Sequence, residues 1–242
     1  MSMMHLDTGR PVGPVTKQRR DEYHTPIGTM ASLSEWDAAQ TTSVPHPICF
    51  TPGTMILTDT AERAIETLRP GDRVVTRDNG VQHIRWIGRR RVAGHGSLAP
   101  VALAAHAVQG AHGPLLVSPH HKVLYTGYVA ELLFGEVEVL VAAKDLIDGK
   151  DVLRQPCDQV TYIHIMFDHH EVIYANGVGT ESCLASDTVL SDLEDATRED
   201  LFTTLPGLRS ASTSHLKPAR PCLATHEAHL LSHAVTGTKR PI

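Results

Sequence analysis

The sequence lacks a long apolar run. No stretch among its 242 residues approaches the ~20 consecutive apolar residues that a membrane-spanning helix needs, so we expect no membrane span. The N-terminal residues MSMMHLDTGRPVGPVTKQRRDEYH also lack the apolar core of a secretory signal peptide. The cytoplasm is therefore the default location, and the cellular location stays unknown because export by another kind of signal leaves no such trace.

The sequence also lacks an excess of basic charge and a compact set of metal ligands. Its formal net charge is −5, which argues against a nucleic-acid partner. Its four cysteines show no C-x-x-C spacing and are too sparse for a disulfide scaffold. The sixteen histidines are scattered, and no pair stands at a compact ligand spacing with a third partner. A histidine-rich metal-binding protein is nevertheless kept as one alternative.

Helical periodicity is nearly absent before residue 186, and short β-branched runs take its place. Runs such as DRVVTRDNGVQHIRWIG and EVIYANGVGTES alternate with Gly, Pro, Asn and Asp, which is typical of strands and turns. Two Asn-Gly pairs, at 79–80 and 176–177, predict hairpin turns because Asn and Gly tolerate positive φ. We therefore predict one compact all-β domain over residues 49–185.

Polar segments flank this predicted domain on both sides. Residues 1–48 are rich in Gly, Pro, Ser and Thr without periodicity and are predicted to form an irregular leader or linker. Residues 186–242 are predicted to form a tail with short helices over 191–205 and 222–235. Ser191, with Glu194 three residues later, fits the N-cap of the first of these helices.

One seven-residue sequence pattern occurs twice within the predicted β domain. PHHKVLY (119–125) and DHHEVIY (168–174) each place two histidines before an apolar run that ends in tyrosine. Neighbouring side chains on a strand face opposite ways, so only one histidine of each pair can face a common centre. The repeat indicates either two related structural halves around one site or a chance similarity of two strands.

The opening of the β domain has a more specific pattern. Cys49 precedes a Thr-Pro-Gly turn, and the run ETLRPGDRVVT follows; VSPHHKVL then supplies Ser118-x-x-His121, and VIYANG closes the pattern at 172–177. In this order the motifs resemble those of Hint domains, the Hedgehog/intein autoprocessing family, and most of all its stand-alone bacterial branch. The resemblance implies the compact, pseudo-two-fold all-β fold of that family, with short flanking helices.

The resemblance also implies a reaction and its residues. Cys49 would attack the carbonyl carbon of Ile48 and form a thioester, so that the chain's own N-terminal segment is the substrate. A second nucleophile would resolve the thioester: an external water or thiol, a sterol-like alcohol or a downstream residue. Such a step needs a thiolate, a proton for the leaving nitrogen and oxyanion stabilisation. His121 is the expected proton donor and Ser118 the residue that hydrogen-bonds near the scissile amide. The reaction occurs once per molecule in cis and needs no cofactor or metal.

The last motif departs from the family pattern. Alignment on Ala-Asn-Gly puts the family's aspartate at His164, and one extra residue keeps His170 as its histidine, so both are candidate auxiliary catalytic groups. Asp168 is a further candidate for orienting a histidine. Inteins end in His-Asn before a nucleophile, whereas GVGTESC has no asparagine before Ser182 or Cys183. We therefore expect N-terminal cleavage or acyl transfer without full splicing, and a catalytically silent structural or interaction module remains the alternative.

Overall fold

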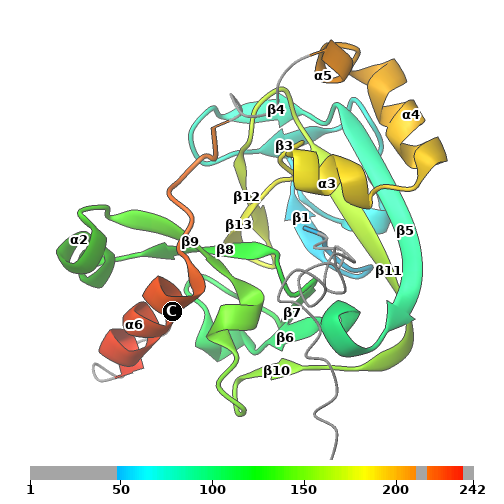
Figure 1. Ribbon diagram of the computed structural model, residues 1–242. Coiled ribbons are helices and arrows are strands. Elements are labelled where there is room, and N and C mark those ends of the chain that lie inside the picture. The colour runs from blue at the N-terminus through cyan, green and yellow to red at the C-terminus, as the bar shows by residue number, and fades with distance from the viewer. Residues whose placement is uncertain (1–47, 211–216, 237–242) are drawn as a thin grey trace, which may run out of the picture. The chain divides into compact units, whose positions relative to one another are not determined.

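The structure is a computed structural model, and it describes residues 48–210 and 217–236 (Figure 1). The predicted leader, apart from Ile48, lies outside the described residues. The longest sheet follows the order β2-β1-β12-β13-β8-β9. Its strands are β1 (Met55–Leu57), β2 (Glu62–Ala64), β8 (Lys122–Thr126), β9 (Glu138–Ala142), β12 (Val172–Ala175) and β13 (Val178–Glu181).

Three smaller sheets complete the β structure of the described chain. One has the order β10-β6-β7, and the others are the pairs β11-β5 and β3-β4. Their bounds are β3 (Arg73–Val75), β4 (Val81–His83), β5 (Trp86–Gly94), β6 (Val101–Leu103), β7 (Leu115–Val117), β10 (Val152–Arg154) and β11 (Cys157–Met166). The named strands pair antiparallel, and strands predominate over helices, as the all-β prediction required.

Both predicted hairpins are present, but only the second has the predicted two-residue turn. Between β3 and β4 the connection covers residues 76–80, and Gly80 has a positive φ of 63° whereas Asn79 does not. Asn176 and Gly177 adopt φ of 49° and 82° between β12 and β13, as a tight primed turn requires. The Asn176 side chain also accepts a hydrogen bond from Met55 N at 2.7 Å and donates to Pro114 O at 2.6 Å. This turn therefore fixes the β12–β13 hairpin against the beginning of β1 and the segment before β7.

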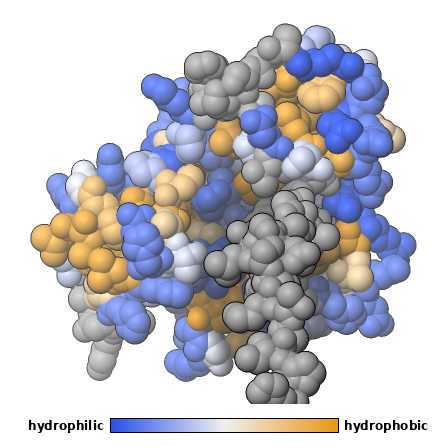
Figure 2. Space-filling view, viewed as in Figure 1, coloured by the Kyte–Doolittle hydropathy of each residue, from blue (hydrophilic) through white to orange (hydrophobic). Residues whose placement is uncertain are grey.

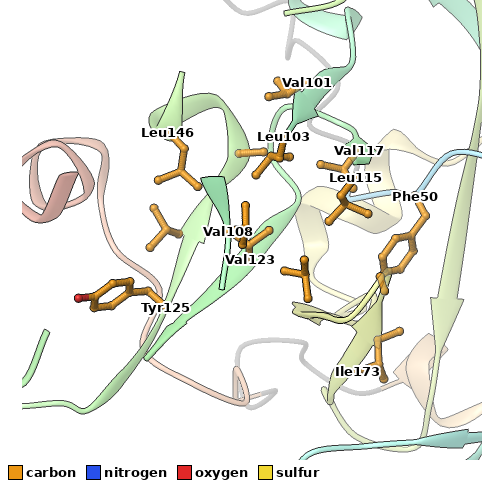
Figure 3. Close-up of a cluster of buried hydrophobic side chains, with 14 of the residues drawn as sticks. Phe50, Val101, Leu103, Val108, Leu115, Val117, Val123, Tyr125, Leu146 and Ile173 are labelled. Atoms are coloured by element: carbon orange, nitrogen blue, oxygen red, sulfur yellow. The ribbon is translucent and has the colours of Figure 1, made fainter. Parts of the chain in front are cut away.

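The main core lies between these sheets. Phe50 belongs to the same buried cluster as residues of β6, β7, β8 and β12, and Figure 3 shows it beside Leu115 and Val117 of β7. Phe50 N and O both hydrogen-bond to Ile163 of β11 at 2.9 Å, and Phe50 also bridges to Val117 of β7. The residues next to Phe50 are thus held between β7 and β11, which is where the candidate site is built.

Short helices surround the β core. They are α2 (Tyr128–Phe134), α3 (Asp187–Asp192), α4 (Asp195–Thr204), α5 (Gly207–Ser210) and α6 (Thr225–Thr236), with 3-10 turns η1 (Ile65–Thr67), η2 (Gly96–Leu98), η3 (Ala105–Ala107) and η4 (Ala143–Leu146). Helix α6 contacts α2, β9 and η4. Figure 2 shows apolar residues gathered over α2, where Tyr128 and Leu132 are exposed.

The prediction of one helix over 191–205 with Ser191 as its N-cap is wrong. Ser186 caps α3 by accepting a hydrogen bond from Val189 N, so this helix begins earlier than predicted. Leu193 is buried and has extended backbone angles, φ −75° and ψ 140°, which interrupt the helix before α4 starts. Burial of an apolar side chain thus outweighs continuation of the helical hydrogen bonds at this position.

Candidate functional site

Cys49 lies in the gap between β7 and β11. Its side chain is fully buried, and its carbonyl oxygen accepts a hydrogen bond from Ser118 N at 3.0 Å. In return, Cys49 N donates to the buried Ser118 Oγ at 2.9 Å. The peptide bond between Ile48 and Cys49 is therefore oriented by its own N–H, which points at the serine that follows β7.

His164 lies on β11, next to the residue that pairs with Phe50. Its Nε2 is 3.2 Å from Cys49 Sγ, and its Nδ1 is 3.0 Å from the carbonyl oxygen of Ile48. Burial lowers the pKa of His164 to about 4, although the hydrogen bond to Ile48 works in the opposite direction. The imidazole is therefore neutral at neutral pH, and it contacts both the thiol and the carbonyl of the Ile48–Cys49 pair.

The packing around His164 explains why β5 has a glycine opposite it. Gly88 is the cross-strand partner of His164, and a Cβ at this position would lie 2.1 Å from Trp86 Cη2. The absence of a side chain lets the Trp86 indole fold back toward β11, where its ring centroid is 6.3 Å from that of His164. Trp86 Nε1 donates to Asp200 of α4 at 2.8 Å, which links this wall of the site to a helix.

His121 follows Ser118 in the turn between β7 and β8. Its backbone N donates to Ser118 O at 3.1 Å, and its ring contacts Phe50 edge-on with a centroid distance of 4.3 Å. Neither ring nitrogen has a hydrogen-bond partner among the described residues. Burial lowers the pKa of His121 to about 4, because desolvation disfavours the charged ring. His121 therefore lies against Phe50, the residue that follows Cys49, as a neutral imidazole with no hydrogen-bond partner among the described residues.

His170 belongs to a separate buried network. Its Nδ1 accepts from Ala219 N at 2.9 Å, so its Nε2 carries the proton and faces Ser182 O at 3.0 Å and Glu181 Oε2 at 3.3 Å. Glu181 also accepts from Lys122 N and Nζ, at 2.9 and 3.1 Å. Burial opposes ionisation of Glu181, but the hydrogen bond from His170 and the nearby positive charge lower its pKa overall.

The two histidine pairs have the same pattern of burial. His121 and His170 are buried, whereas His120 is partly exposed and His169 is exposed. The strands that follow them, β8 and β12, lie in one sheet on either side of β13. Asp168 contacts no histidine among the ion pairs of the described residues and instead pairs with Arg85 at 3.2 Å on the surface.

Sequence reasoning missed one residue of the site. Cys183 Sγ lies 3.7 Å from His164 Nδ1, so two thiols contact the same imidazole. Burial raises the pKa of the Cys183 thiol to about 12, with a further contribution from Glu181. Cys183 follows β13 and donates its backbone N–H to Ile165 O at 2.7 Å. The sequence did contain a signal for Cys183, which is its position directly after the last motif. At that position only the absence of an asparagine was considered.

Two hollows flank the Ile48–Cys49 bond. A small, largely enclosed cavity of about 10 Å³, enough for roughly one water molecule, is lined by Cys49 and His164 together with Val189 and Leu193. An open pocket of about 550 Å³ has Ile48 in its wall. The cavity therefore lies on the sulfur side of the bond and the larger pocket at its acyl residue.

The described residues hold no group of three or more His, Cys, Asp and Glu side chains placed to bind a metal ion. Within the same residues, every helix is too short or too polar to cross a membrane.

The comparisons with known proteins agree with this architecture. A family model described as the Hint domain matches residues 48–187, more than half of the chain. The chain belongs to the Hint domain family. The matched range contains the Ile48–Cys49 bond and every residue that contacts it from β7, β11 and the end of β13. The Hint fold predicted from the sequence is therefore confirmed, and the family is one of autoprocessing domains.

Solved structures resemble the Hint region at low sequence identity. A bacterial intein-like domain from Clostridium thermocellum is 18% identical, with a TM-score of 0.42, over 57% of this chain and 99% of that one. The gp41-1 intein is 12% identical, with a TM-score of 0.33, over 55% and 96%. The MchDnaB-1 intein is 12% identical, with a TM-score of 0.37, over 55% and 99%. Among curated proteins, none matches the chain significantly.

Proposed function

We propose that this Hint domain cleaves the chain before Cys49 through an N-to-S acyl shift, once per molecule. The observation that carries the proposal is the double contact of His164, whose two ring nitrogens face Cys49 Sγ and the Ile48 carbonyl oxygen. The sulfur that loses a proton and the oxygen that gains negative charge during thioester formation are thus within reach of one side chain. The substrate is the segment that ends at Ile48.

The hydrogen-bond pattern assigns the tautomer of His164. A carbonyl oxygen only accepts, so Nδ1 at 3.0 Å from Ile48 O carries the hydrogen. Nε2 is then the basic nitrogen, and it lies 3.2 Å from Cys49 Sγ. In this arrangement His164 takes the thiol proton as Cys49 attacks. The resulting imidazolium strengthens the Nδ1 hydrogen bond to the oxygen that becomes negative.

The leaving nitrogen is served by a different pair of residues. Ser118 Oγ accepts from Cys49 N and so fixes the plane of the scissile amide. His121 lies one turn further along, with both ring nitrogens unpartnered among the described residues. We propose that His121 delivers the proton that the nitrogen needs when the C–N bond breaks. His121 is neutral at rest, so it gives its own ring hydrogen to the nitrogen and regains one from the His164 imidazolium, which holds the proton lost by the Cys49 thiol.

His170 has a supporting role in this proposal. Both of its ring nitrogens are engaged, one by Ala219 N and the other by Ser182 O and Glu181. It is therefore suited to holding the end of β13 in place, directly before Cys183, and less suited to transferring a proton.

The reaction is proposed to end in cleavage or acyl transfer and not in splicing. Splicing by inteins needs an asparagine that cyclises at the second junction, and this chain has none before Ser182 or Cys183. Water or a thiol is the proposed acceptor of the acyl group.

The test is the intact mass of freshly purified protein during incubation at neutral pH. A phosphine reductant keeps Cys49 reduced without adding an acyl acceptor. We expect two products, residues 1–48 and residues 49–242, and no cleavage of the Cys49→Ala variant. Cys222→Ala is the matched control, because Cys222 is exposed. We expect this variant to cleave at the wild-type rate. An unchanged mass in folded wild-type protein would contradict the proposal and leave the Hint domain as a silent scaffold.

A further inference from the structure

Helices α3 and α4 form a wall over the candidate site. Their apolar side chains make one buried cluster with Trp86, Met166 and Cys183, and Ile48 packs against it. Two contacts hold α4 to β5: Trp86 Nε1 donates to Asp200, and Arg90 pairs with Glu194 at 3.4 Å. All but the first residue of α3, and the whole of α4, follow the range that the family model matches, 48–187. The wall is thus an addition to the shared Hint region.

Val189 of α3 stands between the two hollows. It lines the small cavity at Cys49 and His164, and it also lines the open pocket at Ile48. No other described residue lines both. Leu193, one turn further along the chain, lines the small cavity but not the pocket. Val189 therefore lies between the cavity and the pocket.

Burial and the N-terminal cap of α3 hold Val189 in place. Its side chain is only 3% exposed, and its backbone N donates to Ser186 Oγ at the N-cap of α3. Ser186 itself lines the open pocket. The cap fixes the first turn of the helix and with it the valine that lines the cavity.

The two hollows differ in size and therefore in the molecules that they can admit. The cavity of about 10 Å³ holds roughly one water, whereas the pocket of about 550 Å³ is within the range of small-molecule sites. An organic thiol that enters the pocket reaches the side of Ile48, and Val189 is the side chain that this pocket shares with the cavity at Cys49.

We propose that Val189 makes the resolving step of this domain a hydrolysis, by admitting water to the thioester and excluding larger nucleophiles. The inference rests on the proposed acyl shift. In the step itself, a water oxygen bonds to the carbonyl carbon of Ile48 and the bond from that carbon to Cys49 Sγ breaks. One proton of the water passes to the thiolate through His164, and the other is released to solvent when the segment leaves as a carboxylate.

The experiment compares two nucleophiles on four proteins. Sulfide has a single heavy atom, as water does, and 2-mercaptoethanesulfonate is a larger thiol. Mass spectrometry of the released segment distinguishes a carboxylate, a thiocarboxylate and a thioester. The proteins are the wild type, Val189→Ala, Leu193→Ala and Leu190→Ala. Leu190 belongs to the same helix and cluster but lines neither hollow, so it controls for loss of packing.

The wild type is expected to give carboxylate and, with sulfide, thiocarboxylate, but little product with the larger thiol. Val189→Ala is expected to raise the share of thioester product at least tenfold, because it joins the cavity to the pocket. Leu193→Ala enlarges the cavity alone and is expected to speed hydrolysis without admitting the thiol. Leu190→Ala is expected to behave as the wild type.

Equal access of both nucleophiles to the wild type would overturn the inference while leaving the acyl shift in place. This comparison needs no variant, so it decides the matter even if Val189→Ala does not fold. A rise in thiol product of the same size in Leu190→Ala would overturn it as well, since loosened packing would then be the cause. No cleavage in any of the proteins would overturn the proposed function, and this inference with it.

Discussion

At the scale of single residues, one imidazole organises the site. The Ile48 oxygen, Cys49 Sγ and Cys183 Sγ all lie within 3.7 Å of His164 Nδ1. A neutral ring with Nδ1 committed to the carbonyl leaves Nε2 free to act as a base. Where the intein pattern has an aspartate, this chain has a group that can accept the thiol proton and donate to the carbonyl at the same time.

Replacement of His164 separates these two roles. We expect His164→Asn to slow cleavage by about 10²- to 10⁴-fold, the usual contribution of a general base. His164→Asp should recover part of the rate, because a carboxylate accepts the thiol proton but cannot donate to the Ile48 oxygen. The rate of fragment formation by intact mass is the measurement.

His169→Asn is the matched control for these variants, since His169 is exposed on the loop after β11. Equal rates for wild type and His164→Asn would show that the ring takes no part in the reaction.

The sequence predicted some of these residues and missed others for a physical reason. Cys49, Ser118 and His121 stand in motifs whose spacing along the chain is itself informative. Cys183 reaches His164 only because β11 and the end of β13 are hydrogen-bonded side by side, at Cys183 N and Ile165 O. A contact of this kind depends on tertiary packing and leaves no local pattern.

At the scale of elements, the segment that leads into α6 fastens this helix to the Hint region. Ala219 N binds His170, and Arg220 pairs with Asp78 and Glu138 at 2.6 and 2.7 Å. Leu223 N then donates to Leu140 O of β9 at 2.9 Å. Residues 217–223 thus connect the histidine network to α6, although they follow the matched family range.

Two neighbouring leucines of α6 test how far this helix belongs to the core. Leu231 is fully buried in the main cluster, whereas Leu230 is 51% exposed. We expect Leu231→Ala to lower the free energy of unfolding by about 2–5 kcal/mol, from lost burial and the cavity left behind. Leu230→Ala should change it by less than about 0.5 kcal/mol. Urea denaturation of both variants is the measurement. An equally small loss of unfolding free energy in both would mean that α6 is not part of the cooperative unit.

The strands and hairpins were predictable because turn residues act locally, as the positive φ of Asn176 and Gly177 illustrates. The break between α3 and α4 was not, because it results from burial of Leu193 against the β sheet and α3. Local propensity favoured one helix there, and packing divided it.

At the scale of the whole molecule, the buried histidines make stability depend on pH. Burial lowers the pKa of both His121 and His164 from 6.5 to about 4. Below pH 6.5 the unfolded chain binds protons at these rings that the folded chain does not. The free energy of unfolding should therefore fall as pH drops from about 6.5 to about 4, by up to about 1.4 kcal/mol per pH unit for each ring.

Chemical denaturation at pH 7, 6 and 5 measures this dependence. A variant with His121→Gln and His164→Gln should show a flatter profile, because two of the titrating groups are gone. His169→Gln, at an exposed position, should keep the wild-type slope. Equal slopes in all three proteins would mean that the buried rings do not account for the dependence.

The burial of Cys49 N has a consequence for the direction of the reaction. Once the acyl group has moved to sulfur, this nitrogen is a primary amine in a site closed to bulk water, where an ammonium is costly to form. Left unprotonated, this amine is itself a nucleophile beside the newly formed thioester. The acyl shift would thus run readily backwards, and only departure of the upstream segment would make it irreversible.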